Sequence, residues 1–508
     1  MIRLMATLNR REFMAAGAAA AAPPARRPNV LFIMVDEMRW DALHCAGHPV
    51  VETPNLDRLA SQGVRFANAY TVSPVCSPSR ASAFTGRYAH VHGMTINGTC
   101  ARRGEIYLPT ILRHYGYHTS IVGKLHYEPR RFSFGFDEFV SFRGEGPTPE
   151  RGLNAHLRRK YGSPAPFPSV PGTCPWPDDP LGRDVGVFRH ADEDFETEWL
   201  TARSIDYLRS RRDKPEPWFL FTSYLKPHSP SVLPQRWFSK YDPDKIPVPQ
   251  LPPEAKALRA AARNGKRHVI DDERMLRVMS AIYYGAIAEV DACVGRLLDE
   301  LDRLGMADNS VVLFTADHGN MLGDRARFFK GVMYEGSTHV PLLWRGVRGA
   351  AENRGRVEPK IIENTDLAPA LLEAAGLPVP AGMQGRSFLR LARGGDPGWK
   401  DHCFSQLRNA MVRTPGYKFI DNSLDLSGTM ELYDMRNDPR ETRNLAAEPA
   451  QRERIEDFKR RLSAWRKDRP TPVRIPGLAE PDYSAIPDSE REEIRRRAPD
   501  VVAGTVPE

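Results

Sequence analysis

The 508-residue sequence lacks the features that mark several common protein classes. Its six cysteines show no CxxC or CxxH spacing, which argues against a structural zinc site and provides no disulfide framework. No apolar run approaches the roughly 20 residues that a membrane-spanning helix needs, so we expect no membrane span. No stripe of interleaved basic and aromatic residues is present, so nucleic acid is not an expected partner. The cysteines are Cys45, Cys76, Cys100, Cys174, Cys293 and Cys403.

What the sequence does have is the composition of an ordinary globular protein, with 41% apolar and 27% charged residues. The net charge of +8 is mild for this length, and the densest basic cluster, Arg495–Arg497, lies in a polar tail. A positive bias would help to draw anionic esters into a cleft, although a solvated surface is the simpler explanation.

The N-terminus carries the pattern of an export signal. Asn9–Met14 contains an Arg-Arg pair and is followed by an alanine-rich stretch that ends at Ala22. This arrangement resembles a twin-arginine signal, which predicts a periplasmic or secreted protein. The alternative is a disordered arm with an incidental arginine pair on a cytoplasmic protein. Residues 1–27 are left out of the fold prediction in either case.

Strand-like and helix-like segments alternate from Asn29 onward. The strand-like segments are short apolar runs, the pattern of strands that are buried on both faces. A long amphipathic pattern from about residue 274 to 304 predicts a helix before the last of these strands. The alternation predicts an α/β domain over residues 28–400 with a mainly parallel sheet. The predicted strands are Val30–Val35, Thr119–Gly123, Trp218–Ser223 and Ser310–Thr315.

Polar side chains follow each of these strands within a few residues. They are Asp36, His126, His228, and the pair Asp317 and His318. Ligands of parallel sheets gather at the carboxyl ends of the strands, so these side chains are expected to meet at one site.

Three further regions have a different character. Residues 144–195 are rich in Pro, Gly and Asp with little periodicity, which predicts a loop at the rim of the pocket or, alternatively, solvent-exposed padding.

The pattern after residue 400 predicts a small α+β subdomain over residues 401–470. It consists of short strands at 410–413, 417–420 and 431–434, followed by a basic amphipathic helix at 449–467. Residues 471–508 are rich in Pro and charge and are predicted to be an extended or oligomer-contacting tail, with the oligomeric state left open.

One short motif is not explained by core packing. Cys76-Ser77-Pro78-Ser79-Arg80 is followed by Thr85-Gly86-Arg87. It resembles the signature of the type I, formylglycine-dependent sulfatases of the alkaline phosphatase superfamily. The resemblance extends over roughly Pro28 to Leu445. It implies a large mixed, mainly parallel sheet flanked by helices, with a small C-terminal antiparallel sheet and helix. The other matching segments are Gly123–His126, Lys226–Pro230, Lys330–Glu335 and Asp434–Pro439.

The resemblance implies that Cys76 is oxidised to Cα-formylglycine by a maturation enzyme. That enzyme would act in the cytoplasm, because twin-arginine export carries folded proteins. One hydroxyl of the hydrated aldehyde, held on a metal ion, would attack sulfur and form a covalent sulfo-enzyme intermediate. The second hydroxyl would then release the sulfate by carbon–oxygen cleavage.

A metal site is indicated by the acidic residues at the strand ends. Two carboxylates near one point repel strongly unless a cation lies between them. The resemblance implies a divalent cation held by Asp36, Glu37, modified Cys76, Asp317 and His318. Oxygen-rich ligation favours Ca²⁺, and His318 leaves Mn²⁺ or Mg²⁺ open. Because adjacent strand residues point in opposite directions, Glu37 reaches the same ion as Asp36 only if the strand breaks there.

Two cations and a histidine are implied near the nucleophile. Arg80 follows Cys76 by one helical turn if a helix starts near Pro78, and its fixed charge suits the diol and the sulfate oxygens. Lys124 and His126 stand at i and i+2, on one side of an extended segment. In sulfatases the matching residues contact the sulfate and the formylglycine hydroxyl, which gives His126 as the base for release.

The leaving-group side is assigned by resemblance alone. His228, in the Lys226–Pro230 segment, corresponds to a leaving-group contact. Lys330 corresponds to the lysine that bridges sulfate and leaving oxygen, so it is the expected acid.

The predicted function is hydrolysis of a small-molecule or saccharide sulfate monoester. The nearest alternative is the sister group of phosphonate monoester and phosphodiester hydrolases, which lack the Lys and His found here at 124 and 126. Asn97, in contrast, resembles that sister group. A third possibility is a metal-dependent anion-binding protein without catalysis, if Cys76 stays unmodified.

Overall fold

The computed structural model describes residues 27–479 apart from short internal gaps. The twin-arginine segment and most of the predicted tail therefore lie outside the described residues. The gaps are 103, 163–166, 171–172, 174–184, 252–255, 257–259, 261–268, 349, 351–354, 396–397 and 424–427.

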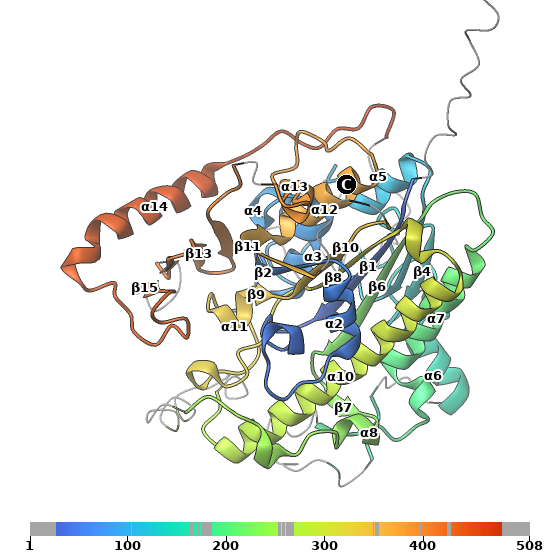
Figure 1. The fold of residues 1–508 in the computed structure, drawn as a ribbon, viewed down its shortest axis with the longest axis horizontal. Helices are drawn as coiled ribbons and strands as arrows, with labels where there is room; N and C mark the ends of the chain where they lie inside the picture. The colour runs from blue at the N-terminus through green and yellow to red at the C-terminus, as the bar shows by residue number, and fades with distance from the viewer. Residues whose placement is uncertain are drawn as a thin grey trace, which may run out of the picture.

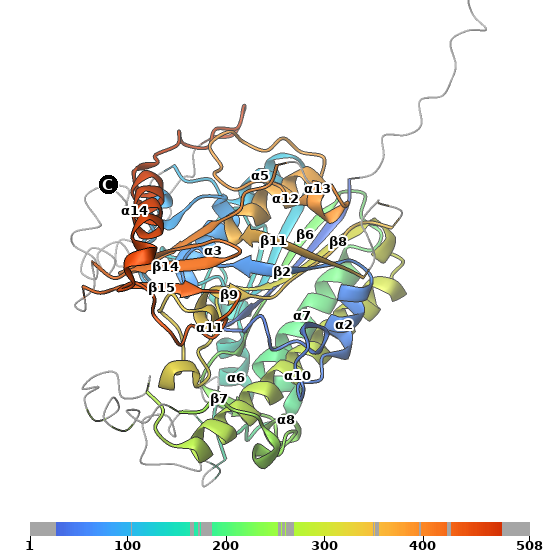
Figure 2. The same ribbon diagram turned by 60° about the vertical axis from the view of Figure 1, so that its left-hand side comes forward.

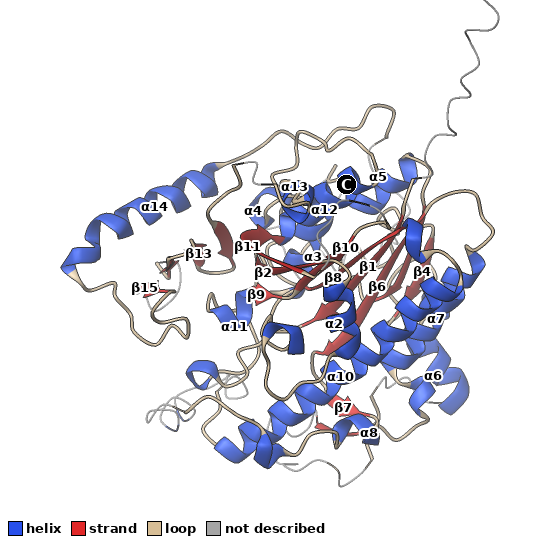
Figure 3. Cartoon of the chain, viewed as in Figure 1, coloured by secondary structure: helices blue, strands red, loops and turns tan. Residues whose placement is uncertain are grey.

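The core of the molecule is a mixed, mainly parallel sheet of nine strands in the order β11-β2-β10-β8-β1-β6-β3-β4, with β9 paired to β2 (Figures 1 and 3). The pairs of β1 with β6 and β8, of β3 with β4 and β6, and of β2 with β11 are parallel, whereas β10 and β9 pair antiparallel. This confirms the predicted fold class. The strands are β1 Asn29–Asp36, β2 Val64–Tyr70, β3 His118–Gly123, β4 Glu138–Ser141, β6 Trp218–Pro227, β8 Ser310–Ala316, β9 His339–Val340, β10 Leu342–Arg345 and β11 Arg356–Glu363.

Helices cover both faces of this sheet (Figure 2). On one face α7 and α10 pack on each other and on β6, and α2 packs on α10 and β10. On the other face α3, α5 and α12 contact one another, and α5 contacts β3. The helices are α2 Pro54–Ser61, α3 Cys76–Thr85, α4 Ala89–His92, α5 Leu108–His114, α6 Leu153–Tyr161, α7 Glu196–Ser210, α8 Gln235–Phe238, α10 Glu273–Arg303, α11 Glu335–Thr338, α12 Leu367–Ala374, α13 Leu389–Ala392 and α14 Arg452–Lys467.

The central strands are enclosed because their sequences offer no polar face. Every residue of β1 and β6 is buried, as the continuous apolar runs predicted. Strand β1 pairs in register with β8 from Asn29 opposite Ser310 to Val35 opposite Ala316. The residues that follow the two strands, Asp36 and Asp317, are therefore carried to the same edge of the sheet.

Helix α10 is the one described helix that is long and apolar enough to cross a membrane by length and composition. No helix of this kind is expected from the sequence. The most apolar window of α10 is 89% buried inside the protein, where it packs against α7 and β6. It is thus placed as a core helix of the α/β layer.

The C-terminal part forms a second, antiparallel sheet of four strands in sequence order, with α14 packed on β13 and β14. Its buried Lys418 forms ion pairs of 2.7 Å with Glu335 and with Glu441, of which Glu335 belongs to α11 of the larger part. The first strand, Cys403–Gln406, was not predicted. The domain boundaries remain a prediction. The strands are β12 Cys403–Gln406, β13 Ala410–Arg413, β14 Tyr417–Asp421 and β15 Met430–Asp434.

The region 144–195 was expected to be irregular, and in part this is wrong. It contains α6, whose Leu153 and Leu157 bury one narrow stripe and whose end is capped by left-handed Gly162. Strand β5, Val185–Val187, pairs with β7, Ser231–Leu233. A stripe of two leucines is too short to register as helical periodicity.

Candidate active site

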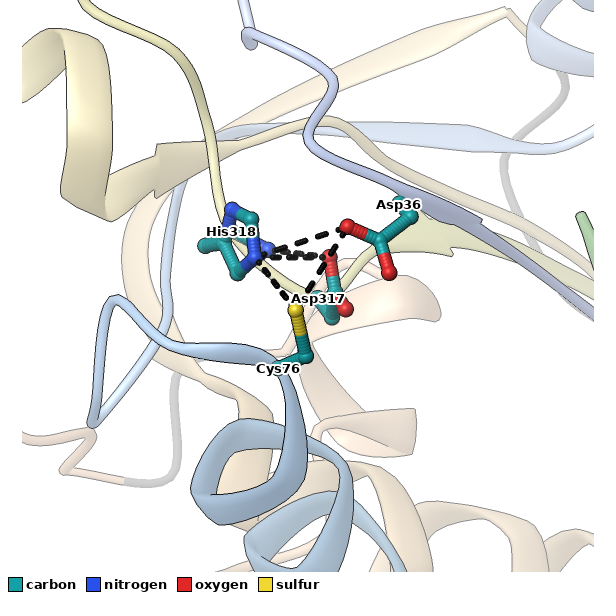
Figure 4. A group of neighbouring side chains, drawn as sticks. All are labelled: Asp36, Cys76, Asp317 and His318. Carbon is teal, nitrogen blue, oxygen red and sulfur yellow. Dashed lines mark hydrogen bonds and ion pairs between the residues drawn. The ribbon is translucent and has the colours of Figure 1, made fainter. Parts of the chain in front are cut away.

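Four buried side chains converge where β1, β8 and α3 end or begin (Figure 4). Asp36 ends β1, Cys76 opens α3, and Asp317 and His318 follow β8. The Cys76 Sγ atom lies 3.2 Å from His318 Nε2 and 3.7 Å from Asp36 Oδ1. His318 Nε2 is 3.6 Å from one oxygen of each aspartate. All four residues are at most 1% exposed, so they form one enclosed donor set, hereafter the acidic cluster.

The donor atoms of the acidic cluster suit a divalent cation. They lie within 4.8 Å of one another and comprise two carboxylates, a sulfur and an imidazole. His318 Nδ1 faces the Gly319 carbonyl oxygen at 3.0 Å, so Nδ1–H donates there and Nε2 is directed into the cluster. A hydrogen bond of this kind, from the ring nitrogen that does not face the metal, fixes the tautomer of metal-binding histidines. Burial lowers the pKa of His318, but the Asp317 carboxylate raises it to about 9.

Arg80 supports the cluster from one turn further along α3, as its spacing from Cys76 predicted. Its Nε donates to Asp317 Oδ2 at 2.8 Å and its Nη2 to Asp36 Oδ2 at 3.2 Å. Nη1 donates to the Lys124 carbonyl oxygen and to Ser223 Oγ, both at 2.8 Å. The side chain is fully buried, so its charge interacts with the two carboxylates in a low-dielectric environment, where the attraction is strong.

The chain leaves the strand geometry at Glu37, which is the condition for Glu37 to bind the same cation as Asp36. The register between β1 and β6 shifts after Val35, and Glu37 has a φ of 70°. Its carboxylate turns to Lys330, whose Nζ lies 2.8 Å from Oε2, and to Asn320, whose Nδ2 donates to Oε1 at 2.8 Å. A ligand atom of Glu37 groups with Asp36 and His228 rather than with Cys76.

Lys124 and His126 both reach the site, but the chain between them is not an extended strand. Strand β3 ends at Gly123, and His126 has a φ of 65°. Lys124 Nζ lies 2.5 Å from Asp36 Oδ2. The backbone at His126 is held from two sides: Ser77 Oγ donates to its carbonyl oxygen at 2.6 Å, and its N–H faces Glu145 Oε2 at 3.4 Å.

Lys330 and His228 stand beside Glu37, on the open side of the cluster. His228 Nε2 is 3.4 Å from Glu37 Oε2. Burial lowers the pKa of Lys330, but Cys76, Glu37 and Asp36 together raise it above its usual value, so the ammonium is retained. Burial and then Lys330 hold the pKa of His228 well below its usual value, so this imidazole is neutral.

A cavity of about 310 Å³ opens above Cys76. The sequence-predicted Lys124, His126, His228 and Lys330 all line it, together with Cys76 itself. Other lining residues were not predicted individually. They are Arg130, Phe142, Arg143, Glu145, Leu225, Ser229 and Phe329, while Asn97 had been noted. They come from β6 and from the loops after β3, β4 and β6 and before α11. Ser229 belongs to the matching segment Lys226–Pro230, and Glu145 belongs to the region 144–195, for which a loop at the rim of the pocket was one of the two expectations.

Comparisons with known proteins identify the family of the chain. The sulfatase family model matches residues 28–377, and that of the N-sulphoglucosamine sulphohydrolase C-terminal region matches 323–468. An arylsulfatase of Clostridium perfringens is 32% identical over 461 residues, 86% of this chain and 93% of its own. An N-acetylglucosamine-6-O-sulfatase of Bacteroides thetaiotaomicron is 27% identical over 83% of each chain. The structure of a phosphonate monoester hydrolase of Agrobacterium radiobacter superposes with a TM-score of 0.74 at 26% identity, over 87% of this chain and 95% of its own. The chain therefore belongs to the sulfatase family of hydrolases, within the alkaline phosphatase superfamily.

Proposed function

We propose that this sulfatase cleaves sulfate monoesters with a formylglycine at position 76 and one divalent cation. The observation that carries the proposal is the position of Cys76, buried at the start of α3 among two carboxylates, a histidine and an arginine, and at the floor of a cavity. Packing alone gives no reason for a cysteine in such polar surroundings.

The donor set fits the proposed cation. Asp36, Asp317 and His318 would hold it, with Glu37 or the modified residue 76 completing the set, and Ca²⁺ is our first choice ahead of Mn²⁺ or Mg²⁺. When bound, the cation would supply Lewis acidity and the hydrated aldehyde would supply the nucleophile. The remaining roles fall to the side chains of the chain itself.

Cationic groups would hold the sulfate. Lys124 lines the cavity and already pairs with Asp36, whereas the fully buried Arg80 does not line the cavity and holds the two aspartates in place beside Cys76. Fixed positive charge in a site shielded from water favours the extra negative charge of the transition state. Lys330 keeps its ammonium charge beside Glu37, so it can donate a proton to the leaving oxygen.

The two histidines are suited to different tasks. His126 Nδ1 is buried and has no hydrogen-bond partner among the described residues, so it is free to take a proton during release of the sulfate. His228 Nδ1 faces the Ser229 carbonyl oxygen at 2.5 Å, which leaves Nε2 as an acceptor on a neutral ring. We therefore assign His228 to contact with the departing alcohol.

Phosphonate monoester or phosphodiester hydrolysis is the second candidate. It is favoured by Asn97, which lines the cavity and accepts a hydrogen bond from the Ser77 N–H at 2.9 Å, and by the likeness to the Agrobacterium hydrolase. Lys124 and His126 favour sulfate, because the sister group lacks both.

Turnover of 4-nitrophenyl sulfate and of a phenylphosphonate monoester tests the choice. We expect sulfate to give the higher kcat/KM, and Cys76→Ala to abolish both activities. A Cys76→Ala protein as active as wild type would remove the nucleophile assignment. A higher kcat/KM for the phosphonate would select the second candidate.

The setting of the reaction is also part of the proposal. The relative named N-acetylglucosamine-6-O-sulfatase supports a saccharide sulfate as substrate. The Arg10-Arg11 pair supports export from the cytoplasm after a maturation enzyme has converted Cys76.

A further inference from the structure

The cavity above Cys76 holds more positive charge than one sulfate group uses. Arg130 and Arg143 line the same cavity as Lys124 and Lys330. The two lysines already pair with carboxylates, Lys124 with Asp36 of the acidic cluster at 2.5 Å and Lys330 with the neighbouring Glu37 at 2.8 Å. The two arginines are therefore an additional cationic pair.

Exposure places these arginines at the mouth of the cavity. Cys76 is 1% exposed and Lys124 6%, whereas the side chain of Arg130 is 54% exposed and Arg143 is also exposed. The lysines thus belong to the floor, around the reacting sulfate. The arginines lie on the solvent side, where the alcohol part of an ester would extend.

The Arg143 side chain is ordered by an aromatic ring, but its charge is not neutralised by a carboxylate. Its guanidinium carbon lies 5.0 Å from the ring centre of the buried Phe142, and no salt bridge joins it to a carboxylate among the described residues. Stacking on an aromatic ring orders a guanidinium without removing its charge. Arg130 has a weak partner, with Nε 3.5 Å from Glu128 Oε1.

The carboxylate within the cavity does not compensate the arginines. Glu145 is the one acidic residue among the described residues that line it. It is 7% exposed, and its Oε2 accepts the Leu125 N–H at 3.1 Å while facing the His126 N–H. Its Oε2 thus faces the backbone after Lys124, and among the described residues no salt bridge joins Glu145 to Arg130 or Arg143.

We propose that Arg130 and Arg143 form a subsite for a second anionic group on the alcohol part of the sulfate ester. Phe329, which is only partly buried, lines the cavity with them and would contact the apolar face of the ring that joins the two anions. The substrate class is thus a sulfate ester whose ring also carries a carboxylate or a second sulfate. This inference rests on the proposed sulfatase activity and adds its substrate preference.

Three aryl sulfates that differ only in a para substituent test it. They are 4-(carbamoylmethyl)phenyl sulfate, which has no second charge, and its carboxymethyl and sulfomethyl counterparts. The methylene group insulates the phenol, so leaving-group strength stays similar. We expect kcat/KM to be about tenfold higher for at least one anionic ester than for the amide, and this ratio to fall with added salt. A larger value for the sulfonate points to a second sulfate, and a larger value for the carboxylate points to a uronate-like acid.

Variants assign the preference to the subsite. Arg130→Ala and Arg143→Ala should each lower the ratio about fivefold and leave the amide ester within about twofold of wild type. Arg143→Lys should keep part of the preference, and Arg158→Ala, an equal charge change on the exposed face of α6, should keep all of it. Equal turnover of the three esters by wild type, or a preference that survives in both alanine variants, would overturn the inference while leaving the sulfatase activity intact. No turnover of any of the three would instead count against the proposed function.

Discussion

Replacing Arg80 with methionine tests how the acidic cluster is held together. The change keeps an unbranched apolar stem but removes the guanidinium, which contacts Asp317 Oδ2 at 2.8 Å and Asp36 Oδ2 at 3.2 Å; all three side chains are fully buried. Lys124 remains beside Asp36, but among the described residues His318 is then the one side-chain cation that pairs with Asp317. Removing one partner of a buried ion pair costs about 3–5 kcal/mol. That is a large part of the roughly 5–15 kcal/mol that stabilises a typical domain.

The assay is urea unfolding followed by tryptophan fluorescence, in a chelator and again with excess Ca²⁺. We expect Arg80→Met to have a much lower midpoint in the chelator. Ca²⁺ should raise the midpoint of the variant more than that of wild type, because the cation then supplies positive charge that Arg80 no longer provides.

Ser223→Ala is the matched control. It removes a neutral acceptor of Arg80 Nη1, which still donates to the Lys124 carbonyl oxygen, so the expected loss is about 1 kcal/mol. An Arg80→Met protein as stable as this control would refute the reasoning, because the two aspartates would then not be charged and buried around Arg80.

Three further outcomes are expected. Lys330→Ala should lower kcat by about 10²-fold or more. The loss should be larger for phenyl sulfate than for 4-nitrophenyl sulfate, because the poorer leaving group depends more on a proton from Lys330. An equal loss for both esters would count against Lys330 as the general acid. Burial lowers the pKa of His92 to about 3. Its Nδ1 accepts a hydrogen bond from the Met94 N–H, and its Nε2–H donates one to Ser82 Oγ. The unfolded chain therefore binds a proton below about pH 6.5 that the folded one does not, so stability should fall between pH 6.5 and pH 3, and less steeply in His92→Gln. Dialysis against a chelator should abolish turnover, and Ca²⁺ should restore it in wild type but far less in His318→Ala; full turnover of the chelated enzyme would contradict the metal assignment.

The strand framework was predictable because burial leaves a direct trace in the sequence. The continuous apolar runs at Val30–Val35 and Ser310–Thr315 have no polar face, and both became central strands within one or two residues of the predicted bounds. Parallel pairing in register then brought Asp36 and Asp317 together, as expected of residues at the same ends of neighbouring strands.

The position of Glu37 depended on a backbone irregularity that the sequence does not encode locally. The register of β1 on β6 passes from Val35 opposite Tyr224 to Asp36 opposite Pro227, so the shift arises from the partner strand. Asp36 and Glu37 can bind the same cation only if the strand breaks between them, and such a break is present. Whether Glu37 binds the same cation stays a prediction.

The outer part of the pocket was the least predictable. Glu145, Arg130 and Arg143 lie on loops without periodicity, and each is an unremarkable charged residue in the sequence. Their proximity to Cys76 follows from the way the loops after β3 and β4 fold over one cavity. Tertiary arrangement of this kind leaves no local pattern.

Mass spectrometry of the tryptic peptide Phe66–Arg80, from protein purified from its native host, shows directly whether Cys76 is converted to formylglycine. We expect an aldehyde or its hydrate at position 76, and sulfate ester turnover that rises in proportion to the converted fraction. A fully active protein whose peptide carries only the intact Cys76 thiol would contradict the proposed mechanism.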